Sequence, residues 1–125
     1  MRYNDRFKFR AYYQGRFIYK SLADANYYDK DNKCIGLANT LPNSLEWEQC
    51  TGLRDKNGNL IYERDIVHYV KHTNLGIGGN RYAKVFWWEN IQGFAIETNY
   101  GDYYGLTDFE IEIVGTIHEN GDLLK

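Results

Sequence analysis

The amino-acid sequence predicts a mainly β protein, a small antiparallel barrel or sandwich. Short strand-like runs follow one another along the chain and are separated by hairpin turns. Aromatic residues make up 17% of the chain and include 12 tyrosines, and aromatic side chains favour the half-buried surface of a sheet. The central residues 47–70 form two such runs joined at residues 55–58, where Asn57-Gly58 favours the positive φ values of a tight hairpin turn.

Length and composition indicate one folded domain over residues 1–125. A chain of 125 residues can bury a single core, and 43% hydrophobic residues with 26% charged residues are typical of a globular protein. No apolar run approaches the roughly 20 residues of a membrane-spanning helix, so we expect a soluble protein. The net charge of −2 argues against a strongly basic surface that would hold nucleic acid along the whole molecule.

The first half of the chain predicts a hairpin followed by a weakly patterned connection. Residues 7–12 and 16–19 are strand-like, and Gln14-Gly15 separates them. In residues 21–32 we expect a loose, partly helical segment, in which Ser21 caps a short helical turn before a turn at residues 29–32. Residues 34–37 are expected to form a short strand, and residues 39–44, which include Pro42, a loop.

The second half predicts three further strand regions. The central hairpin pairs residues 47–53 with 60–70, and the glycine-containing residues 71–81 are expected to form a mobile connection with a poorly ordered tip. Residues 82–88 and 93–98 form a strand and its return partner. Residues 109–117 alternate apolar with acidic side chains at their start, which is typical of a half-buried strand.

Three blocks of sequence carry a family resemblance. They are Lys8-Phe9-Arg10-Ala11-Tyr12, the central TGLRDKNG at residues 51–58 followed by IYERDIV at 61–67, and EIVGTIHEN at 112–120. Through these blocks the chain resembles the YopX family of phage and prophage proteins over nearly its whole length. The resemblance implies a small SH3-like β-barrel with an additional N-terminal hairpin and little helix, in a bacterial host cell. It implies no established activity.

Two residues depart from the pattern of that family. Arg64 stands where the family commonly has glycine, and a long side chain adopts positive φ only at a cost, so the sequence puts a positive φ at this position in doubt. Gly121 stands where the family commonly has proline, which predicts a looser C-terminal turn. Neither departure changes the expected fold.

Glu63, Asp65 and His68 are the nearest approach to a catalytic or metal-binding set. On a continuous strand the two carboxylates share a face and the histidine takes the other, and a metal would need a further ligand such as His118 or Asp108. The favoured interpretation is structural: Asp65 accepts backbone hydrogen bonds where the strand begins.

The other reactive side chains give no stronger signal. His72 and His118 lack an orienting partner in the sequence, and we interpret them as solvated. Cys34 and Cys50 form no CxxC pair and follow no signal peptide, so we expect reduced thiols in a cytoplasm, both as small buried groups. Gly76, Gly78 and Gly79 precede neither a helix nor a GK[ST] ending, which favours a plain strand connection over a phosphate-binding loop. We therefore expect no catalytic residues, no metal and no cofactor.

The adjacent Trp87 and Trp88 point to opposite faces of their predicted strand. If one fills the core, the other tends toward the surface. There it is either an anchor for a protein partner or second subunit, or it is covered by the N-terminal hairpin or by residues 21–32. Both alternatives stay open at this stage.

Two functions follow from the surface residues. The first is a non-enzymatic, self-associating interaction module that contacts a host or phage protein through Trp87, Trp88, Tyr12 and Phe17. The alternative is nucleic-acid binding, with Lys8, Arg10 and Arg16 on phosphates and Tyr12 or Phe17 stacked on bases. An enzyme acting on nucleic acid through Glu63, Asp65 and a metal is the weakest of the three hypotheses.

Overall fold

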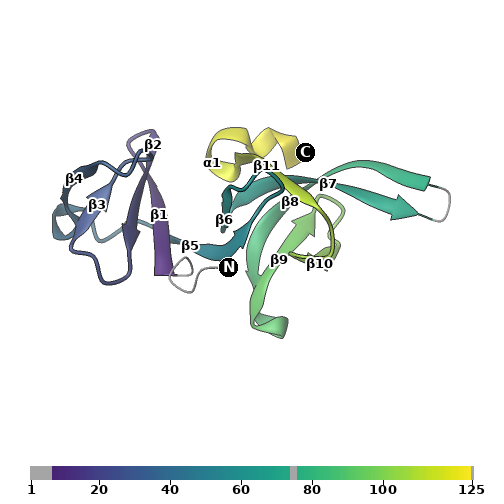
Figure 1. Ribbon diagram of the computed structural model, residues 1–125, viewed down its shortest axis with the longest axis horizontal. Coiled ribbons are helices and arrows are strands. Elements are labelled where there is room, and N and C mark those ends of the chain that lie inside the picture. The colour runs from purple at the N-terminus through teal and green to yellow at the C-terminus, as the bar shows by residue number, and fades with distance from the viewer. Residues whose placement is uncertain (1–6, 74–75, 125) are drawn as a thin grey trace. The chain divides into compact units, whose positions relative to one another are not determined.

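The computed structural model describes residues 7–73 and 76–124, and within these it describes the side chains outside residues 70–80. The backbone forms two antiparallel sheets with a short C-terminal helix (Figure 1). The strands are β1 Lys8–Tyr13, β2 Arg16–Ser21, β3 Asn26–Tyr28, β4 Cys34–Leu37, β5 Glu48–Arg54, β6 Leu60–Tyr62, β7 Asp65–Thr73, β8 Gly76–Trp88, β9 Gly93–Thr98, β10 Tyr103–Gly105 and β11 Ile111–Thr116. The mainly β prediction is confirmed, whereas the described residues form no closed barrel.

The described backbone separates into two compact units. The first unit ends at Gly52 and the second begins at Leu53, so β5 passes from one unit into the other. At this boundary Gly52 has a φ of 82°, a conformation that glycine adopts without the steric cost other residues incur. A glycine therefore allows the irregular backbone of β5 where it leaves the first unit.

The predicted N-terminal hairpin is present in the first unit. Strands β1 and β2 pair without a register shift from Lys8 opposite Ser21 to Tyr13 opposite Arg16. Gln14 and Gly15 have φ values of 53° and 81°, so both central residues of the turn are left-handed, as a two-residue hairpin of this twist requires.

The prediction of a helical turn after Ser21 is wrong. Instead, the carboxylate of Asp24 binds residues of the strand β3, which begins at Asn26. Its Oδ1 accepts a hydrogen bond from the N–H of Asn26 at 3.0 Å, and its Oδ2 accepts one from the hydroxyl of Tyr28 at 2.8 Å. The Asn26 and Tyr28 hydrogen bonds lower the pKa of Asp24, with the charge of Lys20 adding to them. These contacts order β3, beside which β4 forms the predicted short strand.

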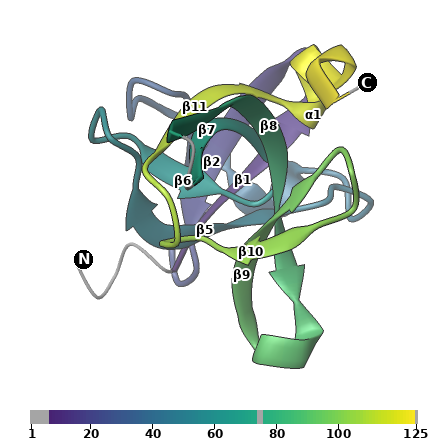
Figure 2. The ribbon, with the colours of Figure 1, turned by 90° about the vertical axis from the view of Figure 1, so that its right-hand side faces the viewer.

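The second unit is built on the sheet order β10-β9-β8-β7-β11, and Figure 2 shows the strong twist of its central strands. Its core contains side chains from each of β6, β7, β8, β9 and β11. They are Ile61, Val67, Tyr69, Ala83, Val85, Ile96 and Ile111, and Leu106, which follows β10, joins them. The alternation of Ala83 and Val85 with Lys84 and Phe86 therefore assigns one face of β8 to this core and leaves the other outside it.

The predicted central hairpin forms as β5 and β6, but its turn is longer than Asn57-Gly58 alone. The N–H of Asp55 donates to the carbonyl of Asn59 at 2.8 Å, and only Gly58, at 86°, has a positive φ within the turn. The carboxylate of Asp55 accepts hydrogen bonds from the N–H groups of Asn57, Asn59 and Ile113 at 2.9 to 3.0 Å. Asp55 thus links this turn to β11 in addition to closing it.

A second turn divides the strand that the sequence predicted over residues 60–70. Strand β6 ends at Tyr62 and β7 begins at Asp65, whose Oδ2 accepts the N–H of Tyr62 at 2.8 Å. Arg64 has a φ of 67°, contrary to the doubt raised by its long side chain. Its N–H donates to the carbonyl of Val85 at 2.8 Å and its carbonyl accepts the N–H of Ile117 at 3.1 Å, so tertiary hydrogen bonds hold the unfavourable conformation.

The connection predicted over residues 71–81 is largely a continuation of β7 and β8. The pairing extends from Ile66 opposite Lys84 to Thr73 opposite Gly76, with a register shift between Val70 and His72. The prediction of a poorly ordered tip falls on residues 74–75, which lie outside the described residues. Backbone pairing thus replaces the expected loop on both sides of that tip.

The C-terminal strand β11 is shorter than predicted at both ends: it begins at Ile111, and Ile117 already belongs to the helix α1 Ile117–Asn120. A 3-10 helix follows at Gly121–Leu124. Gly121 has a φ of −55° and a ψ of −24°, so the position expected to be a loose turn is helical. The N–H of Thr116 donates to Oδ1 of Asn120 at 3.3 Å, which joins α1 to the end of β11.

Candidate binding surfaces

Three aromatic side chains form a cluster on the outer face of the second sheet, which we call the outer aromatic face: Phe86, Trp88 and Tyr103. The ring centroid of Tyr103 lies 5.0 Å from that of Phe86 and 5.1 Å from that of Trp88, the latter at an edge-on angle of 81°. Phe86 and Trp88 lie opposite Ala95 and Gly93, whose small size leaves room for the rings. Tyr103 is 43% exposed and the other two are half-buried.

Trp87 lies on the opposite face of β8 from Trp88, as the sequence predicted for adjacent strand residues. Its ring packs edge-on against Phe94 with centroids 5.1 Å apart, and Phe94 in turn packs against the core of the second unit. Both tryptophans are half-buried, so neither is a fully exposed ring. Trp88 is the one that belongs to the outer face, because it shares the Tyr103 cluster.

Arg10 is buried, so the prediction that it belongs to a basic binding surface is wrong. Its Nε lies 2.8 Å from Oε1 of Glu48, and the two side chains are only 6% and 3% exposed. Its guanidinium also lies over the ring of Phe17, 4.3 Å from the centroid. Because the charge is buried and neutralised within the first unit, this arginine is not available to a phosphate.

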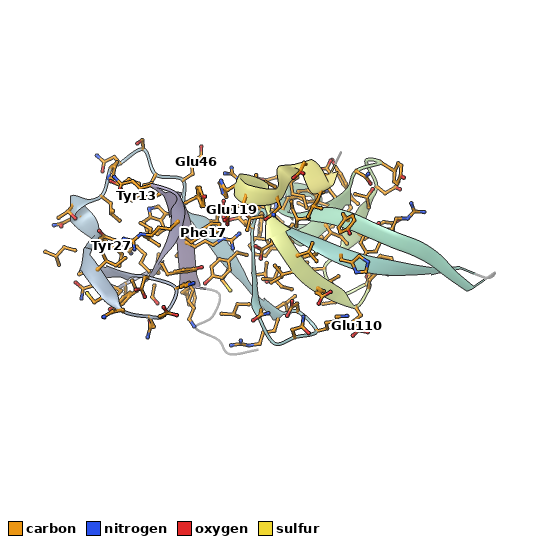
Figure 3. All side chains as sticks on the ribbon, turned by 90° about the horizontal axis from the view of Figure 1, so that it is seen from above. Tyr13, Phe17, Tyr27, Glu46, Glu110 and Glu119 are labelled. Carbon is orange, nitrogen blue, oxygen red and sulfur yellow. The ribbon has the colours of Figure 1, made fainter. Side chains whose placement is uncertain are left out.

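The remaining predicted contacts of the N-terminal hairpin are spread out. Lys8 is half-buried at the open end of the β1–β2 hairpin, and Arg16 is exposed beside the turn at the other end. Phe17 and Tyr12 lie edge-on with centroids 5.0 Å apart, and both are half-buried (Phe17 is labelled in Figure 3). Lys8 and Arg16 therefore lie at opposite ends of the hairpin, and the cation that contacts the aromatic pair is the buried Arg10.

An apolar groove in the first unit was not predicted from the sequence. It has a volume of about 480 Å³, and its walls come from β1, the end of β2 and the segment before β5. The apolar lining includes Phe9, Leu22, Leu41, Pro42, Leu45 and Trp47. A signal was present in the leucines, proline and tryptophan of residues 41–47, since apolar side chains in a segment without strand alternation need another surface to cover.

A smaller and more polar pocket lies in the second unit. It has a volume of about 380 Å³ and is lined by Tyr69, Arg81, Tyr100, Asp102 and Tyr104. Arg81 lies over the ring of Tyr100, with its Cζ 5.3 Å from the centroid, and Tyr100 is 70% exposed. The Arg81–Tyr100 contact forms part of the pocket wall.

The predicted acidic set does not assemble into a metal site in the described part of the chain. Asp65 is buried and accepts the backbone N–H of Tyr62, which confirms its structural interpretation. The side chain of His68 lies beside Tyr82, with ring centroids 5.6 Å apart. Among residues 7–69 and 81–124, whose side chains are described, no group of three or more His, Cys, Asp or Glu could hold a metal ion.

The two cysteines differ from each other. Cys50 is fully buried, as predicted, and its Sγ accepts the N–H of Gly52 at 3.4 Å. Cys34 is exposed on β4, so the prediction that it is a buried group is wrong.

The fold and these surfaces define a mainly β protein that presents an outer aromatic face on one unit and an apolar groove on the other. No helix of the described chain is long and apolar enough to cross a membrane. Residues 2–125 match the family described as YopX protein, and the chain belongs to that family. A comparison with curated protein sequences gave no match.

Proposed function

We propose that this YopX-family protein is a non-enzymatic interaction module of phage or prophage origin that associates with a second copy of itself through the outer aromatic face. The single observation that carries the proposal is the position of this face. In an antiparallel sheet the side away from the core is normally polar and solvated. Here Phe86, Trp88 and Tyr103 occupy it together, and aromatic residues are enriched at the centres of protein contacts.

The charges beside this face support a second copy as the partner. The Nζ of Lys84 lies 3.3 Å from Oε1 of Glu97, and both side chains are about one-third exposed (38% and 31%). In a two-fold symmetric contact both copies use the same surface patch. A residue of one copy can therefore contact a different residue of the same patch on the other copy. Lys84 of one copy can then approach Glu97 of the other while the apolar rings meet between them.

Light scattering after size-exclusion chromatography tests the proposal over a range of protein concentrations. We expect a dimer whose dissociation constant rises by about tenfold or more in Trp88→Ser and in Tyr103→Ser, since truncating a central aromatic residue removes much of the contact energy. Tyr100→Ser is the matched control, because Tyr100 is also an exposed tyrosine but lies outside the aromatic face. A wild-type protein that is monomeric at every concentration would contradict self-association.

A further inference from the structure

We infer that the apolar groove of the first unit is a second binding site, which takes a peptide carrying a large apolar side chain next to a carboxylate. The groove lies within one unit, so it is independent of the outer aromatic face. Its volume of about 480 Å³ falls in the range of small-ligand pockets. Phe9 and Trp47 supply flat apolar walls. Leu22 lies at the margin of the groove with 61% of its surface exposed to solvent.

The groove is held in place by hydrogen bonds of its own unit. The N–H of Leu22 donates to the carbonyl of Phe7 at 2.8 Å, which fixes the end of β2 beside β1. On the other wall the N–H of Leu41 donates to the carbonyl of Ala38 at 3.1 Å, and the N–H of Ala38 donates to Ala25 at 2.8 Å. Both walls are therefore anchored to backbone, and the groove is formed before any ligand binds.

The charge of the lining selects an anionic group. Lys20 is the cation among the described residues that line the groove, and none of these residues carries a carboxylate. The Nζ of Lys20 donates to the carbonyls of Ser21 and Leu22 at 3.0 and 3.5 Å. Both acceptors are neutral, so neither contact compensates the positive charge of the ammonium. The charge of Lys20 also contributes to the lowered pKa of Asp24, but the two oxygens of Asp24 accept hydrogen bonds from Asn26 and Tyr28, and Asp24 does not line the groove.

The polar margin favours a peptide over a lipid or fatty acid. Asn39 and Asn43 line the groove with exposed amides, each of which can both donate and accept hydrogen bonds. A peptide backbone offers the matching donors and acceptors, whereas an alkyl chain offers none. A carboxylate on the peptide can then reach Lys20 while its apolar neighbour enters between Phe9 and Trp47.

The test is a titration of the full chain, followed by NMR, with the blocked peptide acetyl-Ser-Glu-Leu-Phe-Ser-amide and with the same peptide carrying Lys in place of Glu. We expect the indole signal of Trp47 and the amide signal of Leu22 to shift. Affinity for the Glu peptide should exceed that for the Lys peptide by about fivefold, and Lys20→Glu should reverse this preference.

Leu22→Glu should weaken binding of both peptides by about tenfold, because it removes an apolar wall. Leu37→Glu is the control: Leu37 is 52% exposed in the same unit but does not line the groove. The inference is overturned if neither peptide shifts these signals at millimolar concentration, if charge makes no difference, or if decanoate shifts them and the peptides do not. Light scattering measures the dimerisation of Leu22→Glu separately. This measurement distinguishes a failure of the groove proposal from a failure of the proposal for the outer aromatic face.

Discussion

At the scale of single residues, burial decides whether a charged side chain can bind a ligand at the surface or contributes to the interior of the protein. Arg10 was predicted on a phosphate-binding surface, but it lies opposite Glu48 in the β1–β5 pair and is buried with it. A buried ion pair contributes little net stability over apolar residues of the same size, yet removal of one partner leaves a buried charge. The pair therefore makes the two residues depend on each other.

Glu48→Ala should lower the free energy of unfolding by about 3 kcal/mol, because it leaves Arg10 buried without its carboxylate. The double variant Arg10→Met with Glu48→Leu should lose much less, since it removes both charges. Chemical denaturation measures both changes. Glu110→Ala, at an exposed glutamate (Figure 3), should stay within about 0.5 kcal/mol of the wild type, and an equally small effect at Glu48 would contradict the buried pair.

Arg64 shows that tertiary hydrogen bonds can impose a backbone conformation that the residue type disfavours. At a φ of 67°, glycine avoids a steric cost that any side chain with a Cβ incurs. Arg64→Gly should therefore be more stable than Arg64→Ala by about 1 kcal/mol, although both lose the arginine side chain. Thermal and urea unfolding of the two variants side by side measure the difference, and equal stabilities would argue against a left-handed residue here.

At the scale of elements, local signals identified most strands and missed where some of them end. The β1–β2 and β8–β9 hairpins follow their predicted boundaries closely, because alternation and turn residues lie within the same short stretch. Strand β10 was not predicted, since three residues carry too short a pattern. The break between β6 and β7 depends on the side chain of Asp65 and on hydrogen bonds from Arg64 to distant strands.

The junction of β11 and α1 makes an element-scale prediction at Gly115. A Cβ added there would lie 2.6 Å from Cγ and 2.7 Å from Cβ of Asn120, closer than real side chains approach. Gly115→Ala should therefore destabilise the protein by about 2 kcal/mol, as overpacking does.

Gly121→Ala is the matched control for Gly115→Ala in the same C-terminal segment. A Cβ at Gly121 would meet no atom within 4 Å, and its φ of −55° suits alanine. This variant should gain about 0.5 kcal/mol through the lower entropy of its unfolded chain. Thermal denaturation distinguishes the two, and an unchanged melting temperature in Gly115→Ala would contradict the close packing of Asn120.

At the scale of the whole molecule, the chain forms two compact units. The buried ion pair of Arg10 and Glu48 lies in the first unit, and the aromatic and aliphatic core around Tyr69 lies in the second. Composition alone cannot locate the buried ion pair or the core, because it counts residues without saying which of them pack together.

Hydrogen exchange should report these two units separately. In Glu48→Ala we expect amides of β1 and β2 to lose more protection than those of β8 and β9, because the destabilised contact belongs to the first unit. Mass spectrometry of exchanged peptides from each sheet measures the change. Equal loss of protection in both sheets would indicate that the units unfold together.

The sequence by itself determined the β class, the family resemblance, most strands and the structural role of Asp65, because alternation, turn chemistry and motif order are properties of neighbouring residues. The tertiary structure decided the burial of Arg10, the conformation of Arg64, the division at Gly52 and the apolar groove. Each of these depends on residues that are distant along the chain, as Arg10 and Glu48 are, and their proximity follows only from the path of the folded backbone.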